Sequence, residues 1–336
     1  MSNKRDVSIQ LLRIVAMFMI VFDHLVFYIG FPYKSIVVQI TNSGVFIFLL
    51  ISGYLYGQRK IENWKNWFIN RIIKICIPVW IFVFVDLIIE QLIYHNFNIK
   101  NVFIYLFNVE GFINGTQTLI PLWFITLILI CYLITPVLQK VREKSNKSTL
   151  AVITIIILVV QVLMAYVTNI GMVYGHKLSW CILALLMYGV GYYVGDGILN
   201  IKNFHFFIYT LATGIVVFLT IYANKILDGK IIYNDIVVWY GIIVVDLWIS
   251  ITVYKIGRLS WTRHFSVIIN YLDKISFEFY LVHYLIILVA TAQFINKITM
   301  KGYMLLTIAL SILAGTVLHY ISKPVTKVLK QKLIKG

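Results

Sequence analysis

The first candidate for chemistry is a pair of ionisable residues within an apolar segment. Arg13 and His24 lie in LLRIVAMFMIVFDHLVF, residues 11–27, which also contains Asp23. A charged side chain near the centre of a bilayer costs roughly 2.5–3.5 kcal/mol on insertion scales, so such groups usually face a protein interior or a hydrated cavity. On an α-helix the spacing of eleven residues returns to within about 20° of the same direction, about 16 Å further along the axis. Arg13 and His24 are therefore predicted to share one face and to line a path.

The imidazole of His24 suits proton transfer near neutral pH. Acyl transfer to an alcohol needs a base that takes the hydroxyl proton, and an imidazole also serves as a transient acyl carrier, so both roles stay open for His24. Arg13 would bind phosphates or stabilise developing negative charge. In the structural alternative, Arg13 reaches the lipid headgroups and His24 is a packed residue with its hydrogen bonds satisfied. No role for Asp23 follows from the sequence.

A second polar stripe lies near the C-terminal end of the chain. Ser276, Tyr280 and His283 are spaced i, i+4 and i+7, so they share one face of a helix. One interpretation is a wall of the cavity that His24 faces, where Tyr280 and His283 orient the acceptor or a proton. The other is a set of interhelical hydrogen bonds that holds the bundle together.

Buried acidic residues favour a rival function. Asp86 and Glu90 share one helix face, and Asp246 lies in another apolar run. These carboxyl groups would pair with Arg13, stay protonated, or form the proton relay of a transporter. His319 is interpreted as structural.

The composition requires a membrane protein to position these groups. The chain has 336 residues, of which 61% are hydrophobic and 12% are charged, too few polar residues to coat a soluble globule. Barrel-type alternation is absent, so the fold class predicted is an all-α, polytopic bundle of about ten helices. It forms a single membrane domain over residues 1–336, with no appended soluble domain. The ten apolar runs are 8–29, 37–57, 75–94, 119–138, 149–168, 179–196, 204–223, 235–254, 275–295 and 303–321.

The distribution of basic residues sets the expected orientation. With the N-terminus inside, 21 Lys and Arg residues fall on the inner side and 7 on the outer side. Both termini are therefore predicted to be cytoplasmic, in a multi-pass protein of the cell membrane. The net charge of +16 reflects this bias and attraction to membrane lipids, so no nucleic acid partner is expected. The cysteines Cys76, Cys131 and Cys181 form neither a disulfide framework nor a metal pattern, and no metal is required.

Three segments outside this framework carry further expectations. Residues 58–74 interleave basic residues with aromatic ones, which predicts an amphipathic interfacial helix, either an anchor or a basic floor for a phosphorylated cytosolic ligand. Residues 95–118 are too short and too rich in Asn and Gly to cross twice, and are expected to fold back as a re-entrant or surface segment. GYYVG, residues 191–195, fits a GxxxG helix contact. The oligomeric state stays open.

Five segments, in order, resemble the membrane acyltransferase type 3 family. LLRIVAMFMIVFDH contains an Arg-x10-His arrangement like that of the family's first span. The sequence departs from the family pattern at Ser322, where the family commonly has Glu, and at Lys74, where it often has Arg. The other four segments are FIFLLISGYLY (46–56), NRIIKICIPVW (70–80), LIPLWFITLILICYLITPVL (119–138) and ISFEFYLVHYLII (275–287).

The resemblance implies a ten-helix enzyme that acylates cell-envelope sugars. The expected activity is membrane O-acetyltransfer from cytosolic acetyl-CoA to a hydroxyl of a bacterial cell-surface polysaccharide or glycolipid, with His24 and Arg13 catalytic. Arg71 and Lys74 would hold the phosphates of the acetyl-CoA donor. His283, Tyr280 and Ser276 are second-rank substrate residues. Two alternatives remain: a transporter or flippase of a lipid-linked sugar without acyl chemistry, and a purely structural bundle.

Overall fold

The computed structural model describes most of the chain. The described residues are 6–29, 41, 44–94, 98–109, 117–144, 159, 163, 175–227, 238–295 and 297–334. The predicted run 149–168 and the start of the run 37–57 lie outside them, apart from isolated positions.

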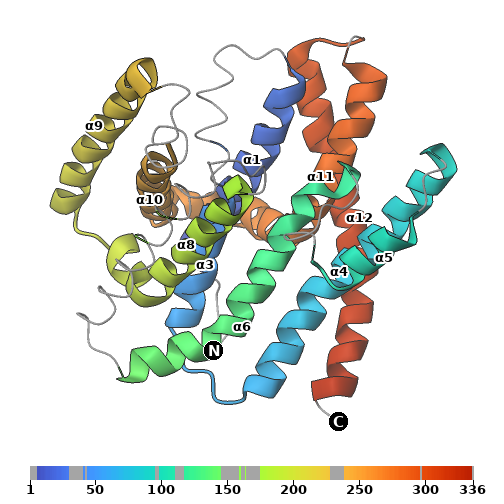
Figure 1. The fold of residues 1–336 in the computed structure, drawn as a ribbon, viewed down its shortest axis with the longest axis horizontal. Helices are drawn as coiled ribbons and strands as arrows, with labels where there is room; N and C mark the ends of the chain where they lie inside the picture. The colour runs from blue at the N-terminus through green and yellow to red at the C-terminus, as the bar shows by residue number, and fades with distance from the viewer. Residues whose placement is uncertain are drawn as a thin grey trace. The chain divides into compact units, whose positions relative to one another are not determined.

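The described residues form helices and no strand (Figure 1). Eight of the helices are long and apolar enough to cross a membrane, and Gly44–Gly57 is a shorter apolar helix. The prediction of an all-α, polytopic membrane bundle is therefore confirmed. The elements are α1 (Val7–Tyr28), α3 (Gly44–Gly57), α4 (Trp64–Tyr94), α5 (Ile99–Leu106), the 3-10 helix η1 (Gln117–Leu122), α6 (Trp123–Lys144), α8 (Gly175–Leu199), α9 (Asn203–Leu227), α10 (Val238–Gly257), the 3-10 helix η3 (Ser260–Phe265), α11 (Ser266–Phe294) and α12 (Met300–Ile334).

The chain divides into two compact units, each built from separate stretches of sequence. Helices α1, α6 and α11 contribute residues to both. The first unit comprises Met1–Met19, Ser35–Lys60 and Ile134–Asn270, and the second comprises Ile20–Lys34, Ile61–Leu133 and Tyr271–Gly336.

In the first unit, α3 and α8 pack so closely that only glycine fits at the contact. A Cβ atom on Gly53 would lie 2.0 Å from the carbonyl oxygen of Tyr188, and one on Gly191 would lie 2.1 Å from that of Leu50. Small residues at four-residue spacing allow such backbone approach between membrane helices. The GYYVG motif is therefore used at a contact within the chain.

One arginine joins the same two helices near their C-terminal ends. The Arg142 guanidinium donates hydrogen bonds to the carbonyl oxygens of Gly57 and Tyr192. It also lies over the Tyr192 ring, 5.7 Å from the centroid. The Gly57 carbonyl, at the end of α3, thus gains a donor, as such a group requires when it lacks an intrahelical partner.

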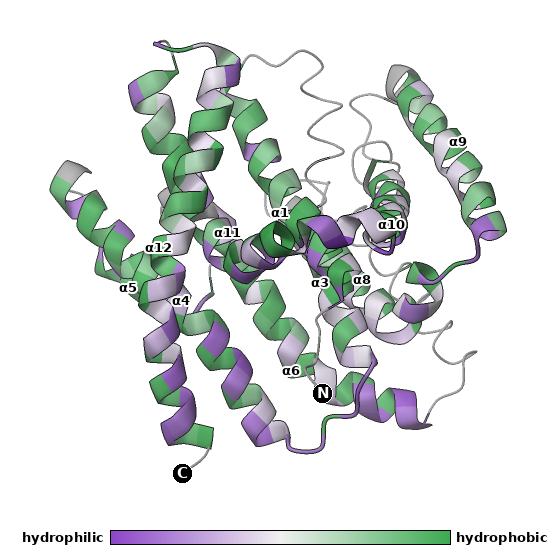
Figure 2. Ribbon diagram, turned by 180° about the vertical axis from the view of Figure 1, so that it is seen from behind, coloured by the Kyte–Doolittle hydropathy of each residue, from purple (hydrophilic) through white to green (hydrophobic). Residues whose placement is uncertain are grey.

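In the second unit, α4 and α12 lie side by side (Figure 1). They contain 31 and 35 residues, so at about 1.5 Å per residue both exceed a hydrocarbon core of about 30 Å. Figure 2 shows hydrophilic residues on the first turns of α4 and the last turns of α12. The basic segment predicted as a separate interfacial helix over 58–74 is, from Trp64 onward, the first part of α4.

Helix α5, the described part of the predicted segment 95–118, packs against α4, whereas residues 95–97 and 110–116 lie outside the described residues. The indole nitrogen of Trp80 donates to the carbonyl oxygen of Leu106 at 3.1 Å. Asn108 has a φ of 53°, a left-handed conformation that Asn tolerates better than most residues. Its side chain contacts the Cys76 thiol at 3.7 Å, and its carbonyl oxygen accepts from Thr126 Oγ1 at 2.6 Å. The segment is thereby fixed between α4 and α6.

Candidate active site

The imidazole of His24 lies against two rings of α11 within the second unit. The centroid of His283 is 5.3 Å from that of His24, with 35° between the ring planes. Tyr284 presents its edge at 5.0 Å and 70°. His24 keeps part of its surface exposed, whereas His283 is completely buried. Of the two histidines, His24 is therefore the less completely buried.

A tyrosine pair supports this arrangement. The hydroxyl oxygens of Tyr28 and Tyr284 lie 3.2 Å apart, which ties α1 to α11 one turn beyond His24. The sequence analysis did not select either residue. Their positions in the sequence could have identified them, since Tyr28 follows His24 by four residues and Tyr284 directly follows His283.

A single hydrogen bond of His283 to a described residue defines the tautomer of its ring. Nδ1 pairs with the backbone carbonyl oxygen of Tyr280, and because a carbonyl only accepts, Nδ1 carries the proton. In the neutral ring Nε2 is then an acceptor. This buried atom makes no hydrogen bond to any residue that the structure describes.

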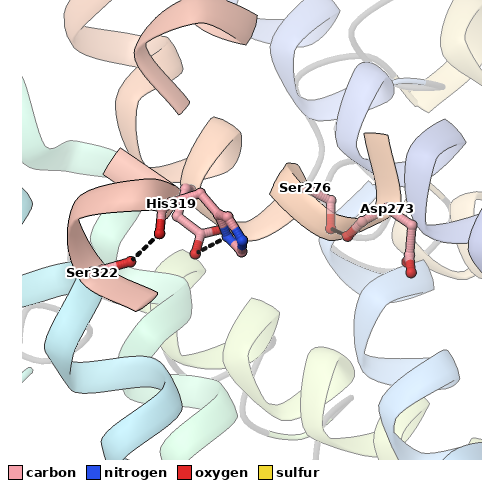
Figure 3. Close-up of polar contacts among 5 residues, drawn as sticks. Asp273, Ser276, His319 and Ser322 are labelled. Atoms are coloured by element: carbon pink, nitrogen blue, oxygen red, sulfur yellow. Dashed lines mark hydrogen bonds and ion pairs between the residues drawn. The ribbon is translucent and has the colours of Figure 1, made fainter. Parts of the chain in front are cut away.

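The other two members of the predicted stripe face different partners. The Tyr280 hydroxyl donates to the carbonyl oxygen of Pro121 in η1, and its ring meets the edge of Phe124 at 5.4 Å. Ser276 Oγ donates to the carbonyl oxygen of Asp273 in its own helix at 2.9 Å (Figure 3). Among the three residues, only His283 contacts the His24 ring.

A basic cluster forms where α4 and α12 pack together. Lys330, half-buried on α12, lies close enough to Lys74 and Arg71 on α4 for their charges to repel it. The Arg71 guanidinium lies over the ring of Trp67, 5.9 Å from the centroid. Cations that converge from two helices form a site for a multiply charged anion. Lys330 was not selected from the sequence, where it is one of several lysines in a basic tail.

The class of the molecule follows from the family that it matches. The model of an acyltransferase domain family matches residues 6–320. The chain belongs to the acyltransferase type 3 family. No curated protein and no solved structure matches it. The match covers both His24 and His283, so this acyltransferase carries the imidazole pair within its family domain.

A carboxylate–imidazole pair lies elsewhere in this acyltransferase, between α11 and α12. His319 Nδ1 is 3.0 Å from Glu278 Oε1, and both side chains are largely buried. Ser322 Oγ donates to the carbonyl oxygen of His319 at 3.3 Å (Figure 3). Ser322 occupies the position where the family resemblance leads us to expect Glu. Near this position the acyltransferase therefore has a carboxylate from α11.

The remaining ionisable residues are placed separately. Arg13 is half-buried and lies in the first unit, on the same continuous helix α1 as His24. Asp86 and Asp246 are fully buried, and Asp23 is 5% exposed. The side chain of Glu90 lies outside the described residues. Burial alone does not assign a role to the acidic residues of the acyltransferase, so their roles stay predictions.

Proposed function

We propose that this acyltransferase moves an acetyl group from cytosolic acetyl-CoA to a hydroxyl of a cell-surface polysaccharide or glycolipid, with His24 as the base. One observation carries the assignment of His24. Its ring is packed against the rings of His283 and Tyr284, and the residue is less completely buried than His283. A base must combine access to the hydroxyl with a fixed direction for its lone pair, because proton transfer depends on geometry before it depends on pKa.

The proposed reaction breaks the C–S bond of the thioester and forms a C–O ester bond. His24 takes the proton of the acceptor hydroxyl as its oxygen attacks the acetyl carbonyl carbon. The departing thiolate of CoA then receives that proton, which regenerates the neutral imidazole. A helix bundle in a membrane favours this transfer over hydrolysis when it limits the access of water to the thioester.

The donor is proposed to bind through the cluster of Arg71, Lys74 and Lys330. CoA carries a 3′-phosphate and a diphosphate, and both are ligands for guanidinium and ammonium groups. The cluster lies in the long, basic parts of α4 and α12. The excess of basic residues on one side supports a cytoplasmic location for the cluster and for both termini.

Two further roles belong to the same proposal. Arg13 is proposed to bind the phosphates of the donor or to stabilise developing negative charge. Tyr280 fixes the segment that precedes α6, through its bond to Pro121, and thereby supports the position of His283. Ser276 keeps only its bond to the Asp273 carbonyl within α11, and its proposed substrate contact stays a second-rank prediction.

Radiolabelled acetyl-CoA tests the proposal with membranes from bacteria that express the chain. Base-labile label is expected in the polysaccharide or glycolipid fraction with the wild type and at background level with His24→Ala. His205→Ala and His264→Ala serve as matched controls, because both residues are exposed and lie in the first unit. Equal expression and helical content are checked for every variant.

Each outcome has a distinct meaning. A His24→Ala protein that labels acceptors at the wild-type rate overturns the assignment of the base. Label that stays covalently attached to wild-type protein identifies His24 as an acyl carrier when His24→Ala abolishes it. Glycans that cross the membrane without acquiring label support a transporter and overturn the proposed reaction.

A further inference from the structure

The buried nitrogen of His283 points to a role that the proposed reaction does not yet use. Nδ1 is held by the carbonyl oxygen of Tyr280, one turn back on the same helix. The other nitrogen lies on the far side of the ring, away from that bond. An unpaired acceptor inside a protein costs free energy, and Nε2 makes no hydrogen bond to any described residue.

The ring distances identify a partner for this acceptor. Among the rings in contact with His283, that of His24 is nearest, with centroids 5.3 Å apart; the corresponding distances are 5.5 Å to Tyr280 and 6.4 Å to Tyr284. Two imidazoles joined by an N–H···N bond of about 2.9 Å have centroids about 5 Å apart. The observed separation fits such a bond, although the described rings do not form it in their present orientation, so the proposed bond requires the His24 ring to turn.

We propose that His283 is a positioning residue that accepts a hydrogen bond from His24 through Nε2. One His24 nitrogen then donates to His283, and the other keeps its lone pair for the acceptor hydroxyl. When His24 takes the hydroxyl proton, the bond to His283 also stabilises the imidazolium ion. The Tyr280 carbonyl sets the tautomer of His283, and His283 sets the tautomer of His24, because the hydrogen bond at one ring nitrogen determines whether the other carries a proton.

The geometry favours this over a packing role for His283. A residue that only fills space needs no nitrogen at the buried position, and an apolar ring would avoid the unpaired acceptor. The neighbouring Tyr284 holds the His24 ring from a second direction. The proposed base is thus held by the edge of Tyr284 and by the proposed hydrogen bond to His283.

Three substitutions of His283 distinguish the role of Nε2 from that of Nδ1. His283→Gln keeps an acceptor near the place of Nε2, His283→Asn keeps a donor near the place of Nδ1, and His283→Leu keeps neither. The kinetics rest on the proposed acetyl transfer. We expect His283→Leu and His283→Asn to lower kcat by about tenfold or more with little change in the KM for acetyl-CoA, and His283→Gln to recover most of kcat.

Nitrogen-15 NMR of histidine-labelled protein in nanodiscs provides a readout that does not require turnover. Signals are assigned by their loss in His24→Ala and in His283→Gln. The wild type is expected to show the Nδ1–H tautomer for His283, and a His24 N–H shift that moves in His283→Leu and is retained in His283→Gln. Circular dichroism and thermal unfolding confirm that each variant is folded.

The two proposals fail in different ways. An Nε2–H tautomer at His283, or a His24 signal that is identical in wild type and folded His283→Leu, overturns the positioning role whatever the enzyme does. Equal kcat values for wild type and folded His283→Leu also overturn it. Absence of acetyl transfer by the wild type, with the expected NMR shifts present, overturns the proposed reaction and leaves the histidine pair in place.

Discussion

The hydroxyl groups of Tyr28 and Tyr284 lie 3.2 Å apart and join α1 to α11 beside the His24 ring. Tyr284 therefore makes two separable contacts, because its hydroxyl meets Tyr28 and its ring edge meets His24. The first contributes to the attachment of the helices, and the second restricts the orientation of the proposed base.

Tyr284→Phe removes the first contact and keeps the second. Interhelical hydrogen bonds in membranes average about 0.6 kcal/mol, so we expect a small loss of stability and nearly unchanged kcat. Tyr284→Leu also removes the ring edge and should lower kcat clearly. Thermal unfolding and single-turnover acetyl transfer measure the two effects, and Tyr28→Phe is the matched control for the hydroxyl. Equal kcat values for the Phe and Leu variants would contradict a role for the ring edge.

Lys330→Ala is expected to raise the KM for acetyl-CoA by about 1.5- to fivefold, because a half-exposed ionic contact is worth about 0.2–1 kcal/mol. The kcat should not change at saturating donor. Lys332→Ala is the control, since Lys332 is exposed on the same helix. Acetyl-pantetheine, which lacks the nucleotide phosphates, distinguishes donor binding from lipid binding. An equal rise in KM for both donors would assign Lys330 to lipid headgroups.

Gly53→Ala is expected to destabilise the first unit by about 1–3 kcal/mol, the usual cost of overpacking. The added Cβ would meet the backbone of α8 at Tyr188, which cannot rotate away. Gly189→Ala is the matched control, because nothing lies within 4 Å of its Cβ position, and alanine favours a helix by about 1 kcal/mol. Thermal unfolding in detergent gives the comparison. A stable Gly53→Ala protein would contradict the close packing of α3 and α8.

The helices were predictable because a bilayer leaves an apolar segment few alternatives. Each long apolar run satisfies its backbone internally only as a helix, and the described helices follow the predicted runs. Their partners were not predictable in the same way. The GYYVG motif of α8 indicated a close contact without indicating α3, and the matching spacing of Gly53 and Gly57 in α3 was recognisable only once the two helices were side by side.

The candidate site was also predictable in part: its residues could be selected from the sequence, but their contacts could not. Periodicity selects a face of one helix, so His24 and His283 were each found, but it does not specify which helix lies opposite. Their contact depends on the packing of α1 against α11. Lys330 was missed for another reason. Its charge fits the general excess of basic residues on one side of the membrane, and only the packing of α12 on α4 sets it apart from its neighbours.

The last prediction concerns Glu278 and His319, which pair at 3.0 Å between α11 and α12. The Glu278 side chain is only 9% exposed, so removing one partner leaves a buried polar group without compensation, at a cost of about 3–5 kcal/mol. We expect His319→Leu and Glu278→Leu each to lower stability strongly, and the double variant to recover much of the loss. A double-mutant cycle on unfolding free energies measures the coupling. Purely additive effects would show that the pair contributes no specific interaction. Because neither residue is among those in ring contact with His24, acetyl transfer per folded molecule should stay near the wild-type value throughout the cycle, which separates this helix contact from the proposed catalytic pair.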